Sequence, residues 1–108
     1  MSGWIRGEQD EPARNDVASA VRLSLRTLAT TAPGRSVEVR VPPFSAVQCV
    51  AGPDHTRGTP PNVVETDPHT WLRLATGLLS WQQAVADGRV DASGTRADLS
   101  HQLPIATI

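Results

Sequence analysis

Proline and glycine residues determine how this chain can be divided into helices and strands. The 108 residues include nine prolines and eight glycines, and both residue types interrupt regular elements. The long stretch that contains neither runs from residue 13 to residue 32. Apolar residues recur within it at helical spacing, at Val17, Ala20, Val21, Leu25 and Leu28. We therefore predict a helix from about residue 12 to residue 31, preceded by a flexible N-terminus over residues 1–11. Leu23 lies off this apolar stripe, and we expect it to face a second partner or a binding cavity.

The segments after this helix have the pattern of strands. The valines of SVEVRV, residues 36–41, alternate with charged residues, which predicts a half-buried antiparallel strand. Residues 44–51, FSAVQCVA, are largely apolar on both faces and predict a central strand that is covered on both sides. Residues 62–66, NVVET, predict a short third strand.

The longest predicted loop lies between the second and third strands. Residues 52–62, GPDHTRGTPPN, are rich in glycine, proline and short polar residues. Because long loops often carry binding residues, Arg57 and Asn62 are candidate contacts to a polar ligand group, and the guanidinium of Arg57 suits a carboxylate or phosphate. The structural alternative is that Arg57 pairs with Asp54 or with a nearby carbonyl.

Two short capped helices are predicted in series. In DPHTWLRLATG, residues 67–77, Asp67 is a good N-cap before a first-turn proline, and Gly77 suits the left-handed position that ends a helix. In the next stretch, LLSWQQAVADG, Ser80 and Gln83 have the spacing of a capping box. We expect the two helices to bend around a sheet, with their tryptophans as buried anchors.

A fourth strand and a third short helix are predicted near the C-terminus. Residues 89–93, RVDAS, alternate as in a strand. Thr95 and Asp98 can cap a short helix in which Leu99 and Leu103 lie one turn apart. Residues 105–108, IATI, form either a tail or a short edge strand.

Composition excludes several classes of function. A formal net charge of −1 argues against nucleic acid as a partner. A single cysteine, Cys49, excludes an internal disulfide framework and fits a cytoplasmic protein. No apolar run approaches the ~20 residues of a membrane-spanning helix, and the first residues lack the pattern of a signal peptide. We therefore expect neither membrane insertion nor export.

The sequence shows no apparatus for catalysis. Cys49 lies in an apolar strand pattern without a neighbouring base, so an inert buried thiol is favoured over a nucleophile. His55, His69 and His101 lack the spacing of metal ligands. We expect no enzyme activity, no metal and no cofactor.

The order of predicted elements indicates an α+β fold. It consists of an N-terminal helix, three antiparallel strands, a two-helix crossover, a further strand and a short C-terminal helix, with the helices covering one sheet face. The stretch from DPHTWLRLATG to HQLP resembles the C-terminal half of the sterol carrier protein family. The matching positions are Asp67, Trp71, Leu74, Gly77, Ala84, Gly88, Val90 and Gly94. With RVPPFSAVQCV and RGTPPNVVETDP included, the chain is similar to small actinobacterial members of that family, and we expect a single domain over residues 12–104.

The resemblance implies a non-enzymatic protein that carries a lipid, an acyl chain or a sterol-like molecule in a cavity between sheet and helices. The residues expected to line that cavity are Leu25, Val39, Val47, Trp71, Leu74 and Leu99; the structural alternative is that all six are core. A similar domain is attached to mycothiol-dependent maleylpyruvate isomerase-like enzymes. A second hypothesis is therefore an interaction module, either a homodimer or a partner of such an enzyme, with exposed Trp4, Trp81 or a strand edge as its anchor.

Overall fold

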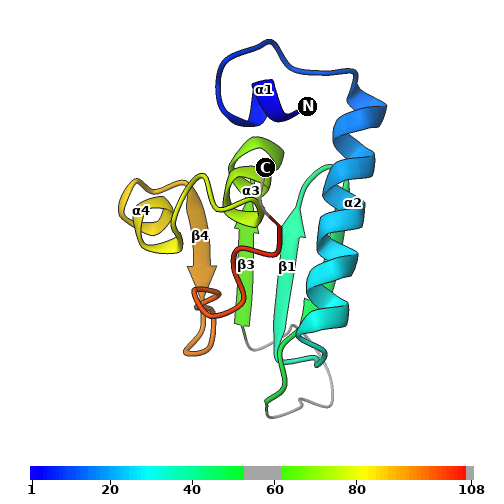
Figure 1. Ribbon diagram of the computed structural model, residues 1–108. Helices are drawn as coiled ribbons and strands as arrows, with labels where there is room; N and C mark the ends of the chain where they lie inside the picture. The colour runs from blue at the N-terminus through cyan, green and yellow to red at the C-terminus, as the bar shows by residue number, and fades with distance from the viewer. Residues whose placement is uncertain (53–61, 107–108) are drawn as a thin grey trace.

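Four strands form one sheet, with helices packed against it (Figure 1). The structure is a computed structural model that describes residues 1–52 and 62–106. Along this part of the chain the elements are α1 (Ser2–Ile5), α2 (Arg14–Thr31), β1 (Val37–Val41), β2 (Ser45–Cys49), β3 (Asn62–Thr66), α3 (Pro68–Ala75), α4 (Trp81–Ala86) and β4 (Val90–Ser93). The α+β class predicted from the sequence is confirmed.

The direction of β3 corrects the prediction of three antiparallel strands. The strand order is β2-β1-β3-β4, so β1 lies between β2 and β3. β1 pairs antiparallel with β2 and parallel with β3, and β3 pairs antiparallel with β4. Cys49 at the end of β2 and Asn62 at the start of β3 both lie opposite Val37. Because β3 starts at the end of the sheet where β1 also starts, it runs in the direction of β1.

Strand β2 lies at an edge of the sheet, and the prediction of a central strand covered on both sides was wrong. Ala46 and Gln48 are exposed, and Val47 is only half-buried, while Cys49 is fully buried. The segment has apolar side chains on both faces, but apolar side chains are common on protein surfaces, so an apolar composition does not require burial.

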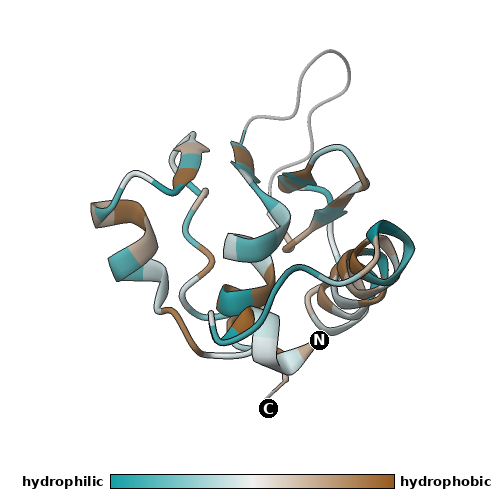
Figure 2. Ribbon diagram, turned by 90° about the horizontal axis from the view of Figure 1, so that it is seen from above, coloured by the Kyte–Doolittle hydropathy of each residue, from teal (hydrophilic) through white to brown (hydrophobic). Residues whose placement is uncertain are grey.

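The helices cover one face of the sheet. Val37, Val39 and Val41 of β1 are fully buried, while the alternate residues Glu38 and Arg40 are only partly buried and form an ion pair with each other. α2 packs against β2 and α3, and Figure 2 shows both helices on the same side of the sheet. The hydrophobic core therefore lies between the valine face of the sheet and this helical layer.

Both ends of the chain differ from the sequence-based predictions. Residues 2–5, assigned above to a flexible N-terminus, form α1, and their Trp4 and Ile5 side chains are buried. The sequence pattern did not reveal this helix, because a segment with only two buried apolar residues is too short to show helical periodicity. Figure 1 shows α1 beside α3, on which it packs.

The predicted C-terminal helix around Leu99 and Leu103 is absent; residues 95–104 form turns and irregular structure. Asp98 does not cap a helix there. Its carboxylate accepts a hydrogen bond from the backbone N–H of Ser100 at 2.8 Å, two residues ahead, and this bond is the main cause that lowers the pKa of Asp98. Such a local bond offers the backbone an alternative to helix formation. Residues 105–106 form no strand.

The predicted caps of α3 and α4 are confirmed, but the predicted crossover is not, because these helices connect the neighbouring antiparallel strands β3 and β4. The Asp67 carboxylate accepts hydrogen bonds from the backbone N–H and the hydroxyl of Thr70, at 2.9 and 2.8 Å, and Gly77 has a φ of 79°. The Ser80 hydroxyl accepts from the backbone N–H of Gln83 at 3.1 Å. The side chain of Gln83 donates to Asp87 at 2.9 Å, so the reciprocal bond of a full capping box is not made.

Replacement of the α3 cap tests how much local structure stabilises the fold. We expect Asp67→Ala to lower the free energy of unfolding by about 1 kcal/mol, because the first turn of α3 loses its acceptor. The measurement is urea unfolding followed by far-ultraviolet circular dichroism. Asp10→Ala, in the exposed segment before α2, is the control and should change stability by less than about 0.5 kcal/mol. Equal effects of the two substitutions would contradict the capping role.

Candidate functional site

An apolar groove with a volume of about 240 Å³ lies between α1, α2, α3 and the C-terminal residues 105–106. We call it the α2–α3 groove. It is lined by Ile5, Ala20, Leu23, Ser24, Thr27, Leu72, Ala75, Thr76, Ile105 and Ala106. All of these side chains are uncharged, so the groove offers no ionic contact to a ligand.

Among the large apolar side chains that line this groove, Leu23 is the most exposed. It is 62% exposed, whereas the neighbouring stripe residues Val21 and Leu25 of the same helix are fully buried. An exposed leucine is ordinary by itself, but this one forms part of a concave apolar wall. The structure therefore places the off-stripe leucine at a cavity, which is one of the two environments that the sequence analysis predicted for it.

The polar atoms of the groove are occupied by the helices themselves. The hydroxyls of Ser24, Thr27 and Thr76 each donate to the backbone carbonyl four residues earlier, at 2.7, 3.0 and 2.7 Å. Because these donors are satisfied, they need no partner from a ligand. The groove is therefore suited to an apolar group.

Trp71 connects the two helices that form the groove. Its side chain is fully buried, and its indole N–H donates to the hydroxyl oxygen of Ser24 at 2.8 Å. This bond satisfies the one polar atom of the indole. It also holds α3 in a fixed position relative to α2, and thereby sets the width of the groove at Ser24.

The C-terminal residues complete the wall opposite Leu23. The backbone N–H groups of Ile105 and Ala106 donate to the carbonyl of Ala75 at 2.9 and 3.1 Å. Ala75 is the last residue of α3, so its carbonyl has no acceptor role within the helix. The chain end satisfies this carbonyl and brings the Ile105 side chain to the groove.

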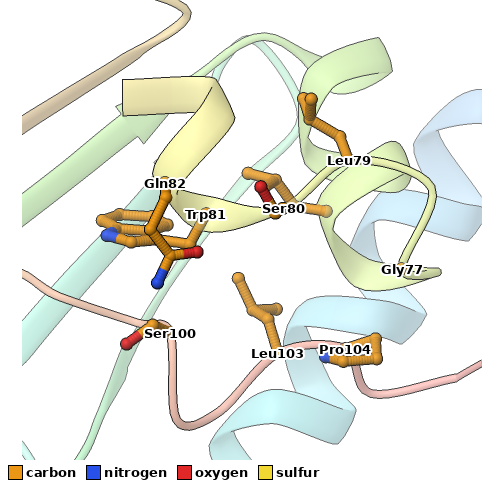
Figure 3. Close-up of a pocket in the computed structure, with 9 residues that line it drawn as sticks. Gly77, Leu79, Ser80, Trp81, Gln82, Ser100, Leu103 and Pro104 are labelled. Carbon is orange, nitrogen blue, oxygen red and sulfur yellow. The ribbon is translucent and has the colours of Figure 1, made fainter. Parts of the chain in front are cut away.

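A second hollow, of about 220 Å³, lies between the α3–α4 connection and residues 100–104 (Figure 3). It is lined by Leu74, Gly77, Leu79, Ser80, Trp81, Gln82, Ser100, Leu103 and Pro104. Figure 3 shows the Leu103 side chain directed toward Trp81 and Ser80. Ser80, Gln82 and Ser100 contribute polar side chains to this lining.

The six residues predicted to line a cavity lie mainly in the packed core. Val47 is half-buried, while the other five, Leu25, Val39, Trp71, Leu74 and Leu99, are at most 1% exposed. Leu74 also borders the second hollow, and none of the six lines the α2–α3 groove. Sequence reasoning missed most of the groove because its residues come from both chain ends and two helices. The sequence signal that could have indicated the groove was Leu23, which lies off the buried apolar stripe of α2.

Of the two polar candidates, Arg57 lies outside the described residues and Asn62 is structural. Asn62 is 3% exposed. Its amide nitrogen donates to the carbonyl of Ser36 at 2.8 Å, and its amide oxygen accepts from the backbone N–H of Arg96 at 2.8 Å. Asn62 therefore ties the start of β3 to the residue before β1 and to the turn after β4.

Replacement of Asn62 should destabilise the fold. We expect Asn62→Ala to lower the free energy of unfolding by about 2 to 3 kcal/mol, because it leaves the buried carbonyl of Ser36 and the partly buried N–H of Arg96 without partners. Gln48→Ala, at an exposed position of β2, is the control and should cost less than about 0.5 kcal/mol. Urea unfolding measures both. An Asn62→Ala protein as stable as the wild type would contradict the structural role.

Two side chains that the sequence analysis weighed for chemistry, Cys49 and His69, are respectively buried and hydrogen-bonded. Burial raises the pKa of the Cys49 thiol to about 11, which keeps it protonated and unreactive at neutral pH. The Nε2 atom of His69 donates to the carbonyl of Trp4 at 2.8 Å. Within residues 1–52 and 62–106, no three His, Cys, Asp or Glu side chains lie together in a way that could hold a metal ion. The arrangement suits binding of an apolar group.

Because the pKa of the Cys49 thiol is raised, we predict that the protein loses stability at alkaline pH. In the unfolded chain a cysteine ionises near pH 9, whereas in the folded protein its pKa is about 11. The stabilising contribution is therefore complete below pH 9 and is lost as the pH rises to 11, by on the order of 2 kcal/mol. The chain contains no lysine or tyrosine, so this thiol is the side chain that titrates in that window.

Urea unfolding at a series of pH values from 8 to 11 measures this effect. The control is Cys49→Ala, which should remove the slope between pH 9 and pH 11 whatever its effect at pH 8. A slope of the same size in Cys49→Ala would show that the thiol is not its cause.

The fold and the groove define a small α+β domain with an apolar groove whose described lining is uncharged. Residues 13–105 match the sequence profile of a family described as Bacterial SCP ortholog, SCP being the sterol carrier protein. The chain belongs to this bacterial branch of the sterol carrier protein family. No curated protein matches the chain. The family match begins after α1.

Proposed function

We propose that this protein binds the apolar tail of a small molecule in the α2–α3 groove and carries it without chemical change. The single observation that carries this proposal is Leu23, 62% exposed in an otherwise uncharged, concave surface. Membership of the sterol carrier protein family supports the same class of ligand. The resemblance placed the ligand between sheet and helices, but the groove lies on the outer side of the helical layer, between α2 and α3.

Burial of apolar surface is the driving force in this proposal. Each methylene group that leaves water contributes about 0.8 kcal/mol. The groove adds no cost for unpaired polar atoms, because the hydroxyls of Ser24, Thr27 and Thr76 bond to their own helices. The polar end of the ligand would remain in solvent, since all lining side chains are uncharged.

The proposal includes a non-catalytic, cytoplasmic role without a cofactor. The buried thiol of Cys49 supports the first part, because its raised pKa removes it as a nucleophile. No helix in the described part of the chain is long and apolar enough to cross a membrane.

The interaction module remains the alternative, but two of its three expected anchors are not exposed. Trp4 and Trp81 are 9% and 8% exposed, and both pack in the hydrophobic core. The third expected anchor for a homodimer or a partner enzyme, a strand edge, is available at β2. That hypothesis stays a prediction.

Substitution of Leu23 tests the proposed site. The neutral apolar dye N-phenyl-1-naphthylamine would be titrated into the protein, and its fluorescence would report binding. Decanoate would then be added to displace the dye. We expect Leu23→Gln to weaken dye and decanoate binding about tenfold, because a polar group replaces buried apolar contact. Val85→Gln is the matched control, since Val85 is 46% exposed on α4 and lines neither the groove nor the second hollow.

The control variant should bind as the wild type does, within about twofold. Binding that is unchanged in Leu23→Gln would refute the groove as the site. A dye that binds no variant at all would refute the proposed function itself.

A further inference from the structure

We propose that α1 forms an end wall of the α2–α3 groove that limits its ligand to an unbranched acyl tail of about nine carbons. This inference rests on the proposed function and adds to it the class and length of the ligand. It follows from the contacts that attach α1 to α3, from the position of Ile5 and from the volume of the groove.

Among the contacts between the N-terminal helix α1 and α3, the pair Trp4 and His69 is joined both by ring stacking and by a hydrogen bond. The rings of Trp4 and His69 are stacked, with their centroids 4.7 Å apart and their planes at 22°. The carbonyl of Trp4 lies 2.8 Å from Nε2 of His69. Because a carbonyl can only accept, Nε2 carries the proton of this bond. The first residue of α3 is Pro68, so His69 lies in its first turn and holds α1 at that end of the helix.

Ile5 is the residue through which α1 reaches the ligand site. It follows Trp4 directly, it is 4% exposed, and it is the α1 residue that lines the groove. The Trp4–His69 contact thus determines where the isoleucine side chain lies. Ile5 lies before residues 13–105, over which the chain matches the family.

The groove is small for the ligands that the family name suggests. Its volume is about 240 Å³, below the roughly 300–1,000 Å³ of most small-molecule pockets. A methylene group occupies about the same volume as a water molecule in the liquid, ~30 Å³. A tail of about eight or nine carbons therefore fills the groove, whereas the fused rings of a sterol exceed it. The uncharged lining leaves the carboxyl or ester end outside.

A series of straight-chain carboxylates tests the length limit. Hexanoate to hexadecanoate would displace N-phenyl-1-naphthylamine from the wild-type protein below their micellar concentrations. Affinity should rise about fourfold with each methylene group until the chain has about nine or ten carbons, and then stay level. The position of this break measures the length of the groove.

Ile5→Ala should move the break to longer chains. The substitution removes three carbons from the wall, so we expect a shift of about two to three carbons, and Ile5→Val should shift it by about one. Val85→Ala, outside the groove, should leave the break in place. If circular dichroism shows that the Ile5→Ala protein is unfolded, the milder Ile5→Val variant decides whether α1 limits the chain length.

The outcomes separate this inference from the proposed function. A break at the same length in wild type and both Ile5 variants, together with weaker binding in Leu23→Gln, would overturn the role of α1 and leave the groove as the site. Affinity that rises evenly to hexadecanoate in the wild type would also overturn the length limit. Absence of displacement by every carboxylate would overturn both proposals.

Discussion

The hydrogen bond from the buried indole of Trp71 to Ser24 joins the two helices on which the rest of the site is built. Trp71 fills the core on one side of α3, and on the other side α3 and α2 form the walls of the groove. The two chain ends then attach to α3, α1 through His69 and residues 105–106 through the carbonyl of Ala75. Helix α3 is therefore the element that positions the walls, and a ligand too large for the groove would have to break one of these contacts.

The core explains why the site lies outside the helical layer. Protein interiors are close-packed, and here the space between the valine face of β1 and the helices is filled by Leu25, Leu28, Trp71, Leu74 and Leu99, each at most 1% exposed. A tunnel between sheet and helices, as the family resemblance implied, would require some of these side chains to be absent. On the far side of α2 and α3, Leu23 leaves apolar surface accessible in the groove.

The helices and their caps could be predicted because the signals that define them are local. Asp67 and Ser80 bond to groups three residues ahead, and the spacing of such pairs is visible in the sequence. The direction of β3 could not be predicted, because it depends on which strand lies beside it and not on its own residues. The edge position of β2 has the same cause. At residues 98–100, a side-chain bond over two residues replaced the predicted helix, since two local structures competed for the same segment.

By itself, the sequence determined the α+β class, the bounds of α2 and β1 to within a residue or two, the two capped helices, and the one leucine of α2 that does not face the core. These features depend on side-chain periodicity and on contacts within a few residues. The tertiary structure alone decided that Ile5, Leu23, Leu72 and Ile105 form one groove, and that Asn62 supports the fold instead of a ligand. The physical reason is distance along the chain: these contacts join residues from opposite ends, and only the packing of α1, α2 and α3 brings them together.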